Sequence, residues 1–155
     1  LLHGDLTAGQ MTGLYTNDKI KAMVNIAHGE GFGLPMFEAA REGLPITTIG
    51  WSGQLDFLNH GGKDYFNEVD YSIQPVQKEV IWKNVIDPDQ MWAYADQGSY
   101  KMALRKIFKK YSKYKELAEE LKEINKEKFS DENLYKIFVD SIQELSEQEE
   151  EIVVL

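Results

Sequence analysis

The chain lacks cysteine altogether, and none of its apolar runs approaches the roughly 18 residues that a membrane-spanning helix requires. Without cysteine, a disulfide scaffold, a thiolate metal site and a cysteine nucleophile are excluded together. The first residues, Leu1 to Asp5, show neither the basic start nor the apolar core of a signal peptide. We therefore expect a cytoplasmic location. A longer parent protein could also attach the chain peripherally to the inner membrane. Because the chain does not begin with Met, we expect that it starts inside such a parent or has been trimmed.

Positive charge is scarce, since 17 Lys and Arg oppose 26 Asp and Glu, for a net charge of −9. A polyanion would be repelled on average, so nucleic acid is not an expected partner. The charge is uneven: residues 101–128 hold ten Lys and Arg against five Glu, and residues 148–155 form an acidic tail. This pattern is typical of a solvated helix followed by an exposed tail.

The segment from residue 20 to residue 49 has the pattern of a strand, a helix and a second strand. Residues 20–27 are mostly apolar and bounded by turn signals, which favours a buried strand. Pro35 suits the first position of a helix, and Gly43 suits its end. Residues 45–49 are rich in the β-branched side chains of strands. Such a unit predicts parallel strands with a right-handed crossover, so the fold class is α/β.

Further elements are expected on both sides of this unit. Thr7 suits the N-cap of a short helix that ends near Tyr15. After the second strand, residues 50–53 predict a turn and residues 70–76 a strand. The pattern of residues 77–97 predicts no particular element.

The last third is expected to be helical, with one break between Tyr111 and Tyr114. Ser130 suits the N-cap of a final helix. Apolar residues recur every three to four positions, which predicts faces that are buried in the core. These residues are Met102, Ile107, Phe108, Tyr111, Tyr114, Leu117, Leu121 and Ile124, and in the final helix Leu134, Ile137, Phe138 and Ile142.

The loop from His28 to Leu34 is the strongest functional signal. Gly29, Gly31 and Gly33 alternate through it and allow a ligand to approach the backbone closely. The loop follows a parallel strand and leads into a helix N-terminus, a combination that suits a phosphate. Its G-x-G-x-G spacing differs from the dinucleotide fingerprint G-x-G-x-x-G, and it lacks the Gly-Lys-Ser/Thr ending of a P-loop.

Two glutamates, Glu30 and Glu38, accompany this loop. Carboxylates accept hydrogen bonds from vicinal hydroxyl groups such as those of a ribose or a hexose. Backbone N–H groups for phosphate and two carboxylates for hydroxyl groups together describe a sugar-nucleotide site. The alternative is that Glu38 only favours the helix dipole and that Glu30 is solvated.

The order of these residues resembles that of the retaining glycosyltransferases with the GT-B fold, of the family 4 type. The similarity covers about residues 6–58. Upstream, Leu6-Thr7 and Met11 to Tyr15 look like the helix that precedes the strand in that family, and downstream Gly53-Gln54-Leu55-Asp56 looks like its Gly-rich turn with an acid. The central motif comprises Glu30-Gly31-Phe32-Gly33-Leu34-Pro35, Glu38-Ala39-Ala40, Gly43 and Pro45.

The resemblance implies a role for each matching position. Glu30 would be the catalytic residue that contacts the hydroxyl groups of the transferred sugar, and Glu38 would bind the ribose. The backbone N–H groups of the intervening residues would contact the sugar and the diphosphate, which concerns Phe32, Gly33 and Leu34. Asp56 stands where the family prefers Glu, and the role of His28 is left open between structure and ligand contact. No metal or cofactor is implied, since the donor substrate itself is a UDP- or GDP-linked sugar.

The resemblance also implies a domain organisation. Residues 1–97 would form a partial Rossmann-like nucleotide-sugar-binding domain, and residues 98–147 would form C-terminal helices that pack on it, ahead of the acidic tail 148–155. The acceptor-binding domain and the basic pair that neutralises the diphosphate would lie upstream of Leu1, so little transfer is expected from this chain alone. The incomplete sheet leaves an edge at which a second copy could pair.

Two other interpretations stay open. The first is a non-catalytic sugar-nucleotide-binding or assembly module with the same fold. The second is an α/β enzyme that uses an unrelated nucleotide, which the mismatched fingerprints disfavour.

Overall fold

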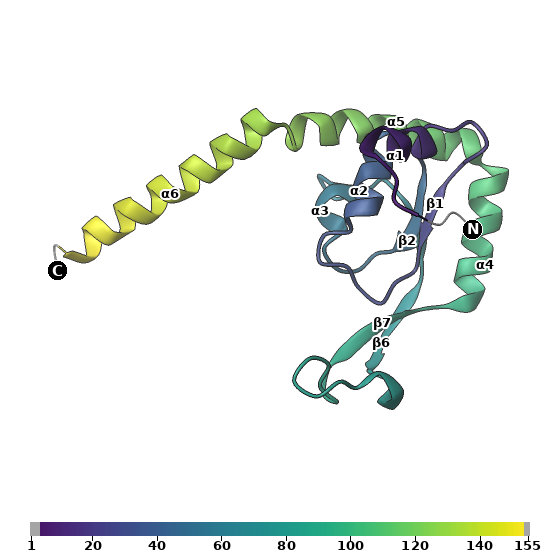
Figure 1. The fold of residues 1–155 in the computed structure, drawn as a ribbon, viewed down its shortest axis with the longest axis horizontal. Helices are drawn as coiled ribbons and strands as arrows, with labels where there is room; N and C mark the ends of the chain where they lie inside the picture. The colour runs from purple at the N-terminus through teal and green to yellow at the C-terminus, as the bar shows by residue number, and fades with distance from the viewer. Residues whose placement is uncertain (1–3, 154–155) are drawn as a thin grey trace.

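The computed structural model describes residues 4–153, and it describes side chains from residue 4 to residue 143. The fold is mixed α/β with a small parallel sheet (Figure 1). The sheet has the order β1-β2-β5, and both neighbouring pairs are parallel. Its strands are β1 (Met23–Asn25), β2 (Ile46–Ile49) and β5 (Asn67–Val69).

The predicted strand-helix-strand unit is confirmed. Met23 pairs with Ile46 in parallel register, and α2 (Leu34–Arg41) connects the two strands. Gly33 caps α2 with a positive φ of 85°, which glycine adopts without strain. The first strand is shorter than expected, because only Met23–Asn25 of residues 20–27 joins the ladder.

The first helix, α1 (Ala8–Tyr15), is capped by Thr7 as predicted. The Thr7 hydroxyl accepts a hydrogen bond from the N–H of Gln10, and the side chain of Gln10 accepts one from the N–H of Thr7. This reciprocal capping box satisfies two donors that the helix itself leaves free. At the other end of α1, Tyr15 is buried beside Ala39 and Leu44, so α1 packs against α2.

The main core lies between α2, α3 (Leu55–Leu58) and α5 (Tyr111–Lys128). Four phenylalanine rings meet there, with centroids 4.9 to 6.0 Å apart. They are Phe32, Phe37, Phe57 and Phe129. Because Phe32 belongs to the glycine-rich loop, this cluster anchors the loop to the core.

The middle of the chain contains two antiparallel pairs. β3 (Asn59–His60) pairs with β4 (Lys63–Asp64), and β6 (Tyr71–Pro75) pairs with β7 (Met91–Ala95). The predicted strand at residues 70–76 is therefore confirmed as β6, whereas its partner lies in the segment for which the sequence predicts no element. The β6–β7 hairpin, which includes a short 3-10 helix η1 (Lys78–Val80), extends beyond the sheet in Figure 1.

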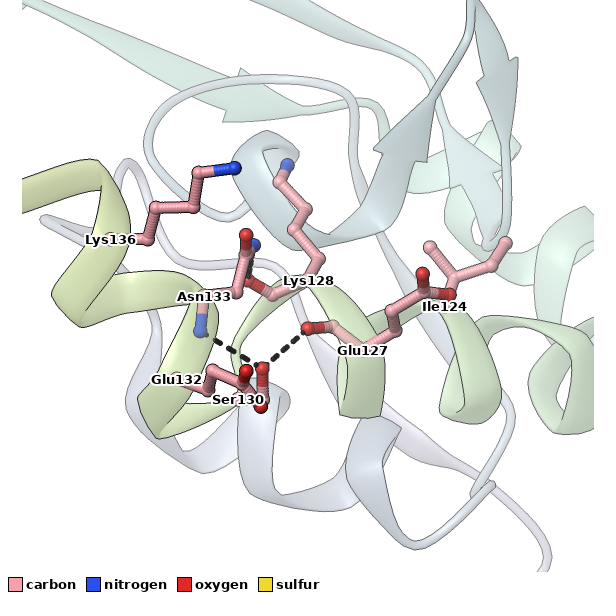
Figure 2. Close-up of a pocket in the computed structure, with 7 residues that line it drawn as sticks. All are labelled: Ile124, Glu127, Lys128, Ser130, Glu132, Asn133 and Lys136. Carbon is pink, nitrogen blue, oxygen red and sulfur yellow. Dashed lines mark hydrogen bonds between the residues drawn. The ribbon is translucent and has the colours of Figure 1, made fainter. Parts of the chain in front are cut away.

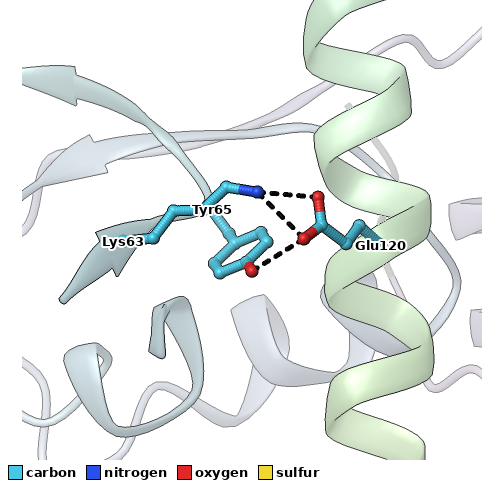
Figure 3. Close-up of polar contacts among 3 residues, drawn as sticks. All are labelled: Lys63, Tyr65 and Glu120. Carbon is cyan, nitrogen blue, oxygen red and sulfur yellow. Dashed lines mark hydrogen bonds and ion pairs between the residues drawn. The ribbon is translucent and has the colours of Figure 1, made fainter. Parts of the chain in front are cut away.

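The helix α5 is tied to β4 by a polar cluster (Figure 3). The Lys63 ammonium lies 2.7 Å from a carboxylate oxygen of Glu120, and the Tyr65 hydroxyl donates to the other oxygen at 2.9 Å. The hydrogen bond from Lys63 holds the pKa of the Glu120 carboxyl below its usual range, and the same bond raises the pKa of Lys63. The cluster joins the exposed side of α5 to β4, while the buried Leu121 of α5 packs in the core.

The structure of the C-terminal helices differs in part from the one that the sequence predicts. α4 (Gln97–Lys109) ends before the predicted break, and its Met102 and Phe108 are exposed rather than buried. α6 (Asp131–Val153) extends away from the body (Figure 1), so its predicted buried face is wrong. The residues of that face are all solvent-exposed, namely Leu134, Ile137, Phe138 and Ile142. Within residues 4–153, no helix combines the length and apolarity needed to cross a bilayer.

Candidate functional site

The glycine-rich loop lies at the carboxyl end of β1, beside the loop that follows β2. Parallel strands bring these two loops to the same edge of the sheet, where α/β proteins bind ligands. Ser52 joins them, since its hydroxyl accepts from the N–H of Glu30 at 3.1 Å and donates to the carbonyl oxygen of Glu30 at 2.7 Å. The N–H of Gly53 donates to the same carbonyl at 3.1 Å. The backbone of Glu30 is thus fixed at three points.

The contact between the two loops leaves no room for a side chain at position 53. A Cβ added to Gly53 would lie 1.9 Å from the carbonyl oxygen of Gly31. Ser52, beside it, has a positive φ of 77°, which is rare for a residue other than glycine. Strain of this kind persists only where neighbouring contacts over-determine the backbone, and it concentrates at functional sites.

The Glu30 side chain is oriented by β1. The amide nitrogen of Asn25 donates to one carboxylate oxygen of Glu30 at 2.8 Å, and the amide oxygen of Asn25 accepts from the N–H of Ala27 at 2.8 Å. Within the part of the chain that the structure describes, the second carboxylate oxygen of Glu30 has no hydrogen-bond partner. That oxygen is available to accept a hydrogen bond from a ligand hydroxyl group.

Three consecutive backbone donors follow Glu30. The N–H groups of Phe32, Gly33 and Leu34 have no acceptor among residues 4–153, whereas the N–H of Phe37 already donates to the carbonyl of Gly33 at 3.0 Å. These three groups belong to the loop and to the first position of α2, where the helix dipole adds positive potential. The arrangement can bind an anion through backbone donors alone.

Glu38 lies in a different environment from Glu30. The Tyr15 hydroxyl donates to a carboxylate oxygen of Glu38 at 3.2 Å. Both side chains line a cavity of about 660 Å³ between α1, α2 and α5, which also contains Arg41, Lys122 and Lys126. Glu30 and Glu38 have different partners, since Glu30 accepts from Asn25 and Glu38 accepts from Tyr15.

Burial, followed by the hydrogen bond to Glu38 and its negative charge, raises the pKa of Tyr15 to about 12. A raised pKa stabilises the fold while both states are protonated, and this contribution is lost as the pH rises from the unfolded value near 10 towards 12. We expect Tyr15 to be deprotonated at a higher pH than an unperturbed tyrosine, and Glu38→Gln to lower its pKa. Titration of tyrosinate absorbance, with Tyr15→Phe to assign the signal, measures both effects. A Tyr15 pKa near 10 in the folded protein would contradict this account of the contact.

His28 has a structural connection to the hairpin. Its Nδ1 lies 2.7 Å from the carbonyl oxygen of Ala93, so this nitrogen carries the proton that is donated. The imidazole ring stacks on Trp92 with centroids 5.0 Å apart, and the N–H of Ala93 donates to the carbonyl of His28 at 3.3 Å. The residue therefore ties the start of the loop to β7.

A second hollow lies where α5 meets α6 (Figure 2). It has a volume of about 520 Å³ and contains none of the predicted site residues. Its Ser130 is the predicted N-cap of α6, because its hydroxyl accepts from the N–H of Asn133 and donates to the carbonyl of Glu127. The hollow is thus a consequence of the helix junction. Among the described residues, no group of three His, Asp or Glu is placed to hold a metal ion.

The structure shows neighbours of the candidate site that the sequence analysis missed. Asn25 and Ser52 hold Glu30, and Tyr15 holds Glu38. Gln54 is buried beside Gly33, and its amide oxygen has no partner within the described part of the chain. Asp56 is exposed in α3, and its backbone carbonyl oxygen accepts a hydrogen bond from the Lys128 ammonium at 2.7 Å. Only Ser52, between two glycines in Gly50-Trp51-Ser52-Gly53, had a recognisable signal in the sequence.

No protein-family model matches the chain, and no curated protein or solved structure matches it.

Proposed function

We propose that the chain is the nucleotide-sugar-binding part of a glycosyltransferase that transfers a sugar from a nucleoside diphosphate sugar with retention. The observation that carries this proposal is the loop at the carboxyl edge of the parallel sheet. It presents three free N–H groups next to a carboxylate whose backbone is fixed by Ser52 and Gly53. The parallel order of β1, β2 and β5 supports a partial Rossmann-like sheet of the GT-B type.

In this proposal, the N–H groups of Phe32, Gly33 and Leu34 bind the diphosphate. They would stabilise the charge that develops on it when the bond to the sugar breaks, as preorganised donors do in other enzymes. The free carboxylate oxygen of Glu30 accepts from a hydroxyl group of the transferred sugar. Glu38 accepts hydrogen bonds from the ribose hydroxyl groups at the mouth of the cavity between α1, α2 and α5.

Positive charge near the nucleotide comes from the helices rather than from the loop. Arg41, Lys122 and Lys126 line the same cavity as Glu38. They would offset the negative charge of a nucleoside diphosphate in a chain whose net charge is −9. An upstream acceptor-binding domain would supply the other half of the site. Among residues 4–153, β1 pairs with β2 alone, so its other edge can pair with a further strand.

We expect the chain to bind one of UDP, GDP, UDP-glucose or GDP-mannose, and we expect Glu38→Ala to weaken that binding by roughly 1–3 kcal/mol. This is the scale of a hydrogen bond to a charged group. Isothermal titration calorimetry of both proteins with the four ligands measures the effect and identifies the base.

Glu116→Ala is the matched control, because Glu116 is exposed on α5 and lines none of the cavities described above. It should leave the affinity unchanged. Preferential binding of ATP or NAD would favour the interpretation as another α/β enzyme. Absence of binding to all four ligands by the folded chain would contradict the proposed site. Transfer activity in a longer protein that contains this chain would separate an enzyme from a non-catalytic binding module.

A further inference from the structure

Two exposed surfaces of the chain have an apolar centre, and the charged residues of their helices have opposite signs. The first is the outward face of α4, which carries Phe108 at 85% exposure. Phe108 borders an open cavity of about 400 Å³ between α4 and the segment that precedes β1. The cavity is lined by Lys21, Ala22, Leu104, Ile107, Phe108 and Tyr111. We call this surface the α4 cavity.

The α4 cavity has a cationic rim. Lys101 and Arg105 share the helix face of Phe108, because they precede it by seven and three positions. Lys21 lines the cavity from the opposite side. The sequence of α4 contains four Lys and Arg and no Asp or Glu. An occupant of this cavity should therefore combine an apolar side chain with negative charge.

The second surface is the apolar stripe of α6. Leu134, Ile137, Phe138 and Ile142 follow the spacing of a single helix face, and Phe138 is 64% exposed. The sequence of α6 contains eight Asp and Glu and one Lys. An apolar helix face of this length is usually covered by a partner, because an exposed stripe gains nothing from the hydrophobic effect.

The α6 stripe does not match the surfaces that lie nearest to it. Its own α5 carries five Lys and five Glu, so it offers no net positive charge to the acidic α6, whereas α4 carries four Lys and Arg and no acidic residue. Pairing of α6 with a second α6 would oppose two acidic helices. The α4 cavity of the same chain lies beyond α5, whose 18 residues span about 27 Å, whereas α6 extends from the opposite end of α5 (Figure 1).

We propose that the chain forms a reciprocal dimer in which the α6 helix of each copy docks its apolar stripe on the α4 cavity of the other. Phe138 and its neighbours fill the cavity beside Phe108, and the net negative charge of the α6 sequence complements the rim of Lys21, Lys101 and Arg105. The contact is made twice about a two-fold axis, so the assembly closes at two copies. Each copy covers both exposed surfaces of the other.

The test is sedimentation-velocity ultracentrifugation of the whole chain over a range of concentrations. A dimer is expected whose dissociation constant rises with salt, because the charges of its rim are screened. Phe108→Asp and Phe138→Asp should each raise the dissociation constant at least about tenfold, as expected for the loss of a central apolar anchor. Both residues are exposed, so the circular dichroism and the melting temperature of the monomer should not change. Trp82→Asp, at an exposed residue of the β6–β7 hairpin, is the control and should leave the dimer intact.

An equimolar mixture of the two variants gives the sharpest outcome. A reciprocal dimer of one Phe108→Asp copy and one Phe138→Asp copy retains one unaltered contact, so the mixture should associate more tightly than either variant alone. A monomer at all concentrations would overturn the proposal. A dimer that only Phe138→Asp disrupts would also overturn it, since this would indicate α6–α6 pairing. Co-sedimentation of a monomeric chain with phosphatidylglycerol vesicles, lost in Phe108→Asp alone, would instead assign the α4 cavity to anionic lipid.

Discussion

Replacement of Phe57 by alanine is expected to lower the free energy of unfolding by about 3–5 kcal/mol, the range for large-to-small changes of buried aromatic residues. The Phe57 side chain is completely buried, and its ring contacts those of Phe32 and Phe37 at centroid distances of 5.1 and 5.2 Å. The loss is large because neighbours from α2, α5 and the loop cannot all collapse into the space that the ring vacates. A small domain has only about 5–15 kcal/mol of stability, so a substantial fraction would be lost.

Urea denaturation of Phe57→Ala, with Phe57→Leu as the control, measures this effect. The leucine variant keeps most of the apolar volume and should lose markedly less stability. Because Phe32 packs on Phe57, the alanine variant should also loosen the loop that offers the N–H donors. Equal stability of the alanine variant and the unmodified chain would show that the aromatic cluster is not the centre of the core.

Gly53→Ala is expected to destabilise the fold by about 3 kcal/mol, the upper part of the usual range for overpacking. The added methyl group would lie 1.9 Å from the carbonyl oxygen of Gly31, so one of the two loops must move. Movement would break the hydrogen bond from the N–H of Gly53 to Glu30 and displace the neighbouring Ser52. We therefore expect nucleotide-sugar binding to be lost together with stability.

Gly31→Ala is the matched control for this effect. Apart from its chain neighbours, no heavy atom of the described residues lies within 4 Å of a Cβ built on Gly31, and Gly31 is not among the residues with a positive φ. The free energy of unfolding of the Gly31→Ala variant should stay within about 0.5 kcal/mol of that of the unmodified chain, as for other surface substitutions. A Gly53→Ala protein that is as stable as Gly31→Ala and still binds the nucleotide sugar would refute the described contact between the two loops.

The elements that the sequence predicted correctly are those set by local chemistry. Thr7 caps α1 and Pro35 stands at the start of α2, because capping and fixed φ values depend on adjacent residues alone. The parallel pairing of β1 with β2 followed from the short connection through a helix. The sequence signal was therefore sufficient for the strand-helix-strand unit that carries the loop.

The elements that it missed depend on tertiary contacts. The periodicity of α6 indicates that one face is apolar, but it does not indicate whether the chain itself covers that face. Strand β5 is only three residues long, and it is identified by its pairing with β2 rather than by its composition. Periodicity likewise assigned Phe108 to the core, although the body of the protein lies on the opposite face of α4.

The candidate site also has a part that the sequence predicts and a part that depends on tertiary contacts. The glycines and glutamates of the loop are adjacent in the sequence, so their pattern is readable. The hydrogen bond between Tyr15 and Glu38 joins residues 23 positions apart, and that between Ser52 and Glu30 joins residues 22 positions apart. The cations of the Glu38 cavity come partly from α5, in the last third of the chain, so no local motif could have assigned them to the site.

The central claim is that the free N–H groups of the loop bind the diphosphate of a nucleotide sugar. Nitrogen–proton NMR correlation spectra, recorded during titration with UDP-glucose and with GDP-mannose, test it most directly. The account predicts that one of these ligands shifts the amide resonances of Phe32, Gly33 and Leu34 most strongly, with smaller shifts around Glu38. Saturating shifts that leave these three amides unchanged, or spectra that neither ligand alters, would contradict it.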